Sequence, residues 1–265
     1  MSHASRTRVR FTGERLHQGA ALFAVDLARH EAAYELALRH AGVTGARVLD
    51  LGCGSGYGSA QLARGGARVV GVDRVTPDAA HRASAAFVLG DLNALPLREC
   101  SFDLVVSFQV IEHLRDPAAY LEAIARLVRP EGQALLTTPN RLTSDGVNPY
   151  HVHEYTGEEL AGLLFRYFED VALQGIGMSA PVRAYMDARS ARIRKIMRLD
   201  PLGLRERLPR ALVEKLFAFF ARVVRRRTHD GDGTPDVSSQ DFPIGPARPD
   251  DIDLVALCRA PRQPR

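Results

Sequence analysis

Three glycines follow an acidic residue closely enough to form the turn of a nucleotide-binding site. The stretch VLDLGCGSGYGS carries Asp50 and then Gly52, Gly54 and Gly56. The dinucleotide fingerprint G-x-G-x-x-G would need its third glycine at position 57 or 59, and those positions hold tyrosine and serine. A carboxylate at position 50 would repel a pyrophosphate and suits a cationic group. The turn therefore favours a ligand that carries an ammonium group and no phosphate.

Two further acids follow the next predicted strands. Asp73 ends the strand predicted at 67–73, roughly 20 residues after the glycines, where a carboxylate can accept both hydroxyls of a ribose. Arg74 could then flank an adenine. Asp91, beside the backbone of Leu92, could accept a hydrogen bond from the adenine amino group. An amino acid, a ribose and an adenine in chain order predict S-adenosylmethionine (SAM) as the cofactor and S-adenosylhomocysteine as the product.

Three histidines are candidates for a catalytic base. His151 and His153 follow the strand predicted at 132–140, near the expected methyl group, and His113 lies in the segment IEHL. A base is needed only if the acceptor must lose a proton. The alternative is that His151 braces the loop and His113 packs beside the cofactor. His151, His153 and Glu154 are a thin set of metal ligands without a companion Cys/His cluster, so we expect no metal.

The elements that must position these residues alternate along the chain. Apolar periodicity predicts one or two helices over 19–41. Strands are predicted at 46–52, 67–73, 86–91, 101–110, 132–140, 169–178 and 251–260, and helices at 57–66, 116–128 and 156–168. Asp116 is placed to cap one helix, and Thr156 with Glu159 has capping-box spacing. The fold class is therefore α/β, a doubly wound and mostly parallel sheet with helices on both faces.

Composition divides the chain into three parts. Residues 1–18 are polar and basic and are expected to form a flexible arm. Residues 19–178 together with 251–261 form the predicted cofactor-binding domain. Residues 179–250 are an insertion that begins as basic amphipathic helices, with fourteen Lys/Arg against four Asp/Glu over 183–227. The end of the insertion is rich in Gly, Pro, Asp and Ser, so we expect it to be loop or disordered.

The motifs as a set resemble those of the class I SAM-dependent methyltransferase family. They are VLDLGCGSGYGS, VVGVD, FVLGDLNALPL, SFDLVVSFQVIEHL and LVRPEGQALLTTPN, in order over about 95 residues. The resemblance implies a Rossmann-like sheet of seven strands in the order 3-2-1-4-5-7-6, the seventh antiparallel.

The resemblance also implies roles for individual residues. The glycines would approach the methionine end of SAM, Asp50 would support its amino group, Asp73 would bind the ribose, and Asp91 with Leu92 would bind the adenine. Phe108 and Gln109 would line the methionine side. In the quinone-biosynthesis and glycan-tailoring branches, a pattern H-x-x-x-aromatic-Ser/Thr is matched here by His151, Tyr155 and Thr156. His113 resembles a residue that commonly lies near the cofactor.

The insertion joins the sixth strand to the antiparallel seventh, so it must leave and return over the rim of the expected active site. We therefore expect residues 179–250 to form a substrate lid. Its arginines could face a phosphate, a carboxylate or an anionic membrane surface. The alternative is a solvated basic hairpin packed on the domain.

Bulk composition is typical of a soluble globular protein, with 46% apolar and 25% charged residues and a formal charge of +4. No apolar run approaches the roughly 18 residues of a membrane span. The first residues lack the apolar core of a secretory signal, and three scattered cysteines fit a reducing compartment. We expect a cytoplasmic protein; its oligomeric state is not indicated.

The sequence thus predicts an enzyme that moves a methyl group from SAM to a small-molecule acceptor, with an oxygen of an amphiphilic or anionic metabolite favoured. Two alternatives stay open. One is a nucleic-acid or protein methyltransferase that docks through the basic insertion, although a nucleic-acid partner is disfavoured because base-stacking aromatics are few and tryptophan is absent. The other is a non-catalytic SAM-binding regulatory subunit.

Overall fold

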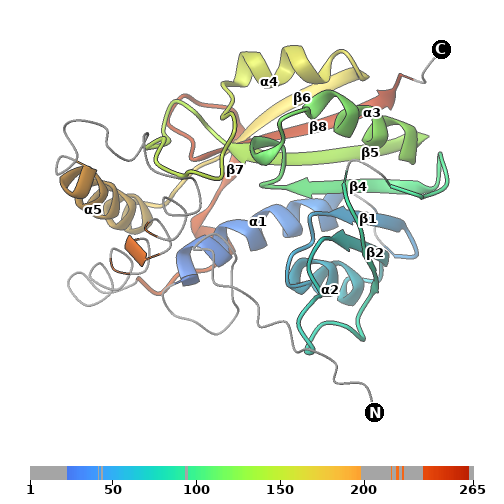
Figure 1. Cartoon of the computed structure of the whole chain (residues 1–265), viewed down its shortest axis with the longest axis horizontal. Helices are drawn as coiled ribbons and strands as arrows, with labels where there is room; N and C mark the ends of the chain where they lie inside the picture. The colour runs from blue at the N-terminus through green and yellow to red at the C-terminus, as the bar shows by residue number, and fades with distance from the viewer. Residues whose placement is uncertain are drawn as a thin grey trace.

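The protein is built around one mixed sheet. The computed structural model describes residues 23–40, 42, 44–92, 95–197, 216, 219–220, 223 and 235–262. These residues form an eight-stranded sheet in the order β3-β2-β1-β4-β5-β8-β6-β7, with helices against both faces (Figure 1). The predicted α/β class and the order of the seven predicted strands are confirmed, the seventh being β8, and a short edge strand is added.

Five strands make up the parallel part of the sheet. They are β1 (Arg47–Leu51), β2 (Arg68–Asp73), β3 (Ala86–Leu89), β4 (Phe102–Phe108) and β5 (Val128–Pro139). Each pairs in parallel with its neighbour in the order β3-β2-β1-β4-β5. Because parallel strands end at one edge of a sheet, the loops that carry the predicted site residues all leave from that edge.

Helices bury both faces of this sheet. They are α1 (Ala24–His40), α2 (Tyr57–Arg64), α3 (Pro117–Leu127) and α4 (Gly157–Leu164). Val48 of β1 packs with α1 and α2, whereas Leu49 and Leu51 pack with α3 and α4. Successive side chains of β1 point to opposite faces of the sheet and are buried in two different cores, which explains why its sequence is a continuous apolar run.

Side-chain caps fix where two helices begin, as predicted. The Asp116 carboxylate accepts hydrogen bonds from the backbone N–H groups of Ala118 and Ala119 at the start of α3. Thr156 and Glu159 form the reciprocal capping box of α4. The second cap matters for the site because it fixes the end of the loop that follows β5.

The far side of the sheet is antiparallel. β8 (Asp253–Pro261) lies between β5 and β6 (Phe168–Ile176) and runs antiparallel to both. The added strand, β7 (Ile244–Pro246), pairs antiparallel with β6 at the edge of the sheet.

The predicted insertion begins with a helix and ends in ordered structure. Helix α5 (Ala180–Met197) follows β6, and its Val182 and Tyr185 are buried in the core that covers α1. The segment expected to be loop or disordered contains the turn η3 (Ser239–Asp241) and β7. The difference arises because Phe242 is 2% exposed in the α1 core, and a single anchoring aromatic is not visible in a composition dominated by Gly, Pro, Asp and Ser.

Parts of the predicted architecture lie outside the described residues. These are the arm at 1–18 and most of the second basic helix of the insertion. Of the latter, Leu216, Phe219 and Phe220 are described and are exposed. Among the residues that the structure describes, no helix combines the length and apolarity that crossing a membrane would require.

Candidate functional site

The glycine turn between β1 and α2 is held in a left-handed backbone conformation. Gly52, Gly54 and Gly56 have φ of 78°, 54° and 86°. A Cβ on Gly52 would lie 2.4 Å from Val110 Cγ2, and one on Gly56 would lie 2.9 Å from the Phe87 ring. A Cβ on Gly54 would meet no atom within 4 Å. Protein side chains therefore pack against Gly52 and Gly56, whereas none of the described residues fills the space beside Gly54, and a ligand could approach the backbone there.

Asp50 lies beneath this turn in a closed polar cluster. Its side chain accepts a hydrogen bond from Ser59 Oγ at 2.6 Å, and the Tyr34 hydroxyl lies 3.3 Å from both carboxylate oxygens. Burial raises the pKa of the Asp50 carboxyl to about 7, although these hydrogen bonds act in the opposite direction. A nearby cation would stabilise the charged form of this carboxyl.

Asp73 links the end of β2 to the glycine turn. Its Oδ2 accepts from the Gly54 backbone N–H at 2.9 Å, and its Oδ1 accepts from the Val75 N–H at 3.0 Å. Each carboxylate oxygen has a second lone pair. The predicted ribose acceptor is thus oriented by the same turn that would bind the methionine end.

The residues predicted to contact adenine form an ion pair at the surface. Arg74 Nη2 lies 2.8 Å from Asp91 Oδ2, with side chains that are 67% and 49% exposed. Leu92 is half-buried against the core beneath α3. The structure therefore brings these three together next to the ends of β2 and β3, with the Asp91 carboxylate shared by Arg74.

Phe108 and Gln109, at the end of β4, occupy different surroundings. The Phe108 ring is buried and packs edge-on against the Tyr34 ring, with a centroid distance of 4.8 Å. It therefore supports the Asp50 cluster through Tyr34. Gln109 has a φ of 56°, unusual for a residue with a side chain, and its Nε2 donates to Thr137 Oγ1 at 3.4 Å. Strained residues of this kind cluster at functional sites.

His113 ends the short turn η2 (Ile111–His113), directly after β4. Its Nδ1 lies 3.1 Å from the carbonyl oxygen of Tyr150, which can only accept, so Nδ1 carries the proton. The lone pair is then on Nε2, the nitrogen that lies 4.0 Å from Glu112 Oε1. The side chain is 32% exposed, so Nε2 is accessible to a ligand at the edge of the sheet.

His151 reaches the same place from the loop after β5. Its Nδ1 lies 2.6 Å from Glu154 Oε1, and its ring packs edge-on against that of His113 at 4.9 Å. Burial raises the pKa of Glu154, but hydrogen bonds from His151 and Ser144 outweigh it and the net shift is downward. Glu154 is therefore a carboxylate that holds the proton on Nδ1, which leaves Nε2 to accept from Asn148 Nδ2 at 2.8 Å.

His153, the third predicted histidine, is not part of this cluster. Its side chain is 49% exposed, and its Nε2 lies 3.8 Å from Glu159 of α4. Its ring packs on Tyr155. It contributes to the loop and not to the group formed by His113 and His151.

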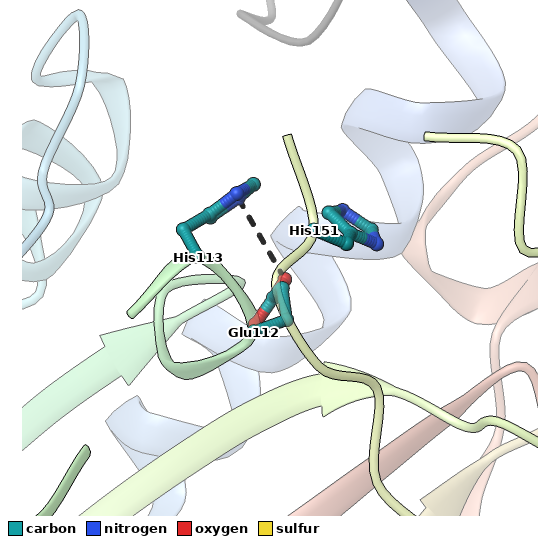
Figure 2. A group of neighbouring side chains, drawn as sticks. All are labelled: Glu112, His113 and His151. Carbon is teal, nitrogen blue, oxygen red and sulfur yellow. Dashed lines mark ion pairs between the residues drawn. The ribbon is translucent and has the colours of Figure 1, made fainter. Parts of the chain in front are cut away.

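Glu112 is a site residue that sequence reasoning missed. Figure 2 shows its carboxylate beneath the adjacent rings of His113 and His151. Its Oε2 accepts from Thr138 Oγ1 at 3.0 Å, and its backbone carbonyl accepts from the N–H groups of Val152 and His153. Burial raises the pKa of this fully buried carboxyl to about 7. The sequence pointed to this segment only through His113. Tyr34 and Ser59 were missed because they are distant from Asp50 along the chain, and sequence spacing does not predict such a contact.

A separate hollow lies at the other edge of the sheet. It encloses about 340 Å³ and is lined by residues that include Asp103, Arg129 and Gln133, near the start of β4. None of the predicted site residues lines it. The chemistry-bearing side chains, the open glycine and the strained Gln109 all lie at the carboxyl edge.

A glycine turn and acids at the ends of adjacent parallel strands characterise an α/β fold that binds a nucleoside. Comparison with known proteins agrees: residues 49–136 match the family described as methyltransferase domain. A probable S-adenosylmethionine-dependent methyltransferase of Mycolicibacterium smegmatis is 37% identical over 267 residues, covering 94% of this chain and 95% of that protein. The chain belongs to the SAM-dependent methyltransferase family, and its cofactor is SAM.

Two other similarities are narrower. A ubiquinone biosynthesis O-methyltransferase of Aromatoleum aromaticum is 38% identical over 112 residues, which cover 39% of this chain and 48% of that protein. A solved SAM-dependent methyltransferase of Thermotoga maritima, described as a possible histamine N-methyltransferase, has a TM-score of 0.53 and 15% identity, over 90% of this chain and 92% of that one. The latter shows the fold alone.

Proposed function

We propose that this enzyme transfers the methyl group of SAM to an oxygen of a small amphiphilic or anionic molecule. The observation that carries the proposal is the pair His113 and His151, whose protons are held on Nδ1 by a carbonyl and a carboxylate. Both rings therefore have their lone pair on Nε2 at the edge where SAM is expected, and that of His113 can accept a proton. The partial similarity to a ubiquinone biosynthesis O-methyltransferase supports an oxygen acceptor.

The reaction needs little from the protein beyond alignment and one proton acceptor. The acceptor oxygen would attack the sulfonium methyl in line, the C–S bond would break, and S-adenosylhomocysteine would leave. The hydroxyl proton would pass to Nε2 of His113, which receives no hydrogen bond from the described residues. Nε2 of His151 already accepts from Asn148, so we assign it to positioning.

SAM would be bound by the residues at the ends of the first three strands. The open backbone at Gly54 would receive the methionine end, with Asp50 supporting its amino group, and Asp73 would accept from the ribose hydroxyls. Asp91, Leu92 and Arg74 would surround the adenine. This assignment follows the chain order of the parts of SAM and the position of each residue at the carboxyl edge.

Incubating the protein with methyl-labelled SAM and a cell extract tests the acceptor class. We expect label in the solvent-extractable small-molecule fraction, with the methyl on oxygen as judged by NMR, and about 100-fold less turnover for His113→Asn with SAM affinity retained. The variant His153→Asn is the matched control from the neighbouring loop. Label found only in protein or nucleic acid, or SAM binding without any transfer, would favour the alternatives of a macromolecular acceptor or a regulatory subunit.

A further inference from the structure

One buried carboxylate oxygen at the site has no partner. Glu112 is fully buried, and while Oε2 is bonded by Thr138, Oε1 receives no hydrogen bond within the described part of the chain. Leaving such an atom unpaired costs free energy, on the order of 1–3 kcal/mol or more for a charged group. An unpaired oxygen held rigidly in place therefore requires an explanation.

This oxygen points toward the two imidazoles. One ligand atom each of Glu112, His113 and His151 lies within 4.8 Å of the others, and Figure 2 shows them converging from η2 and from the loop after β5. Donors that each lie about 2.1 Å from one ion in tetrahedral geometry are about 3.4 Å apart. The 4.0 Å between Glu112 Oε1 and His113 Nε2 and the 4.8 Å limit of the whole set exceed this distance, so the side chains would have to close by about 0.6–1.4 Å to bind an ion together.

Both histidines have the partners that metal-binding histidines have. A metal-ligating imidazole usually donates its other N–H to a backbone carbonyl or a carboxylate, which fixes its tautomer. His113 donates to the Tyr150 carbonyl and His151 donates to Glu154. In each ring this leaves Nε2 as the ligand; for His151, an ion would replace the hydrogen bond from Asn148.

We propose that Glu112, His113 and His151 bind a divalent first-row transition metal. Two imidazole nitrogens and one carboxylate oxygen suit Zn²⁺, Fe²⁺ or Mn²⁺ better than Mg²⁺ or Ca²⁺, which prefer oxygen ligands. Three protein ligands leave a coordination position open, as in catalytic sites. The set differs from the one that the sequence suggested, because His153 and Glu154 take other roles.

The ion would change how the acceptor is activated. A hydroxyl bound at the open position would have its pKa lowered by the metal and would release its proton to solvent at this partly exposed edge, because in the metal-bound enzyme His113 would be a ligand and no longer the base. Only this role rests on the proposed function; the binding of the ion does not, so it is tested without SAM or acceptor.

The test measures metal binding to the full chain after treatment with a chelator. We expect one equivalent of Zn²⁺ to bind in calorimetric titration, and Co²⁺ to give the visible absorption of a site with few ligands. Glu112→Gln and His113→Asn should each weaken Zn²⁺ binding by tenfold or more, and Glu154→Gln by about 10–100-fold because it releases the ring of His151. His153→Asn, from the same loop, should leave the affinity within about twofold.

Three results would overturn the proposal: no Zn²⁺ or Co²⁺ binding, equal affinity in His113→Asn, or equal loss in His153→Asn. SAM affinity and thermal unfolding of each variant show whether it folds, and His113→Asn serves if Glu112→Gln does not, because the His113 side chain is partly exposed. If SAM binds and labels an acceptor in the absence of any metal, the proposed function stands and the role of the ion in activating the acceptor fails, whereas the titrations alone decide whether the ion binds.

Discussion

At the residue scale, a substitution of Gly54, the central glycine of the turn, should affect ligand binding more than folding. A Cβ at Gly54 would stand in open space, whereas a Cβ at Gly52 would collide with Val110. Both residues have a positive φ, so alanine at either position costs about 1–2 kcal/mol through the backbone alone. Any further difference in stability or SAM affinity between the two variants therefore comes from what the added methyl group meets at each position.

We therefore expect Gly54→Ala to weaken SAM binding by about 100-fold while lowering the free energy of unfolding by only about 1–2 kcal/mol. Gly52→Ala should destabilise the fold by more than that, because Val110 must also move. Calorimetric titration with SAM and denaturant unfolding measure the two effects. A Gly54→Ala protein that binds SAM normally would place the cofactor elsewhere.

We expect the buried carboxyl of Asp50 to make SAM binding depend on pH. Burial raises its pKa from 3.8 to about 7 in the folded chain, so the folded state binds the proton more tightly than the unfolded state. The free energy of unfolding should accordingly fall as pH rises from about 4 to about 7. If the ammonium of SAM lies near this group, binding favours the carboxylate and releases a proton.

SAM affinity should therefore rise with pH below about 7, by up to about tenfold per unit, and level off above it. Titrations in two buffers with different ionisation enthalpies would detect the released proton. In Asp50→Asn the rise and the proton release should disappear, while Ser59→Ala should keep both. Equal affinity for SAM at about pH 5.5 and about pH 7.5 would show that Asp50 does not face the ammonium.

At the scale of elements, one ion pair joins helix α5 to helix α1. Arg189 of α5 and Asp26 of α1 lie 3.2 Å apart, with side chains 18% and 10% exposed. Burial lowers the pKa of Arg189, but the neighbouring Asp26 outweighs it and the net shift is upward. Tyr34 of the same helix α1 contacts Asp50, so α5 is joined to the Asp50 cluster through two contacts.

Breaking this pair from one side should be costly. We expect Arg189→Met to lower the free energy of unfolding by about 3 kcal/mol, because it removes the guanidinium that pairs with the buried Asp26 carboxylate. Adding Asp26→Asn should restore part of the loss. Arg183→Met, which breaks the exposed pair of α5 with Asp250, should cost less than about 1 kcal/mol. Similar losses for the two single variants, measured by denaturant unfolding, would contradict this account.

Some elements could be predicted because their signals are local. The caps at Asp116 and Thr156 and the apolar runs of the strands act within a few residues, and the structure has them where expected. The strand β7 was not predicted, because what orders it is pairing with β6 and the burial of Phe242 against a distant helix. Neither contact leaves a trace in local composition.

For the whole molecule, the residues predicted to bind SAM depend on local signals, whereas the Glu112, His113 and His151 group depends on contacts between distant segments. The residues predicted for SAM come from one strand–turn–helix unit and its neighbours, so their order along the chain indicated their arrangement. The Glu112, His113 and His151 group combines two loops, and the tautomers depend on Tyr150 and Glu154. The sequence identified both histidines but could not show that a buried carboxylate lies next to both of them.

The position of β8 has a consequence for synthesis of the protein. This strand fills the space between β5 and β6, yet more than 70 residues separate it from β6 along the chain. The ribosome adds about 5–20 residues per second, so the edges of β5 and β6 would both stay unpaired for several seconds before β8 is synthesised. Unpaired edges are where chains associate with one another, so this enzyme should depend on chaperones most during that interval.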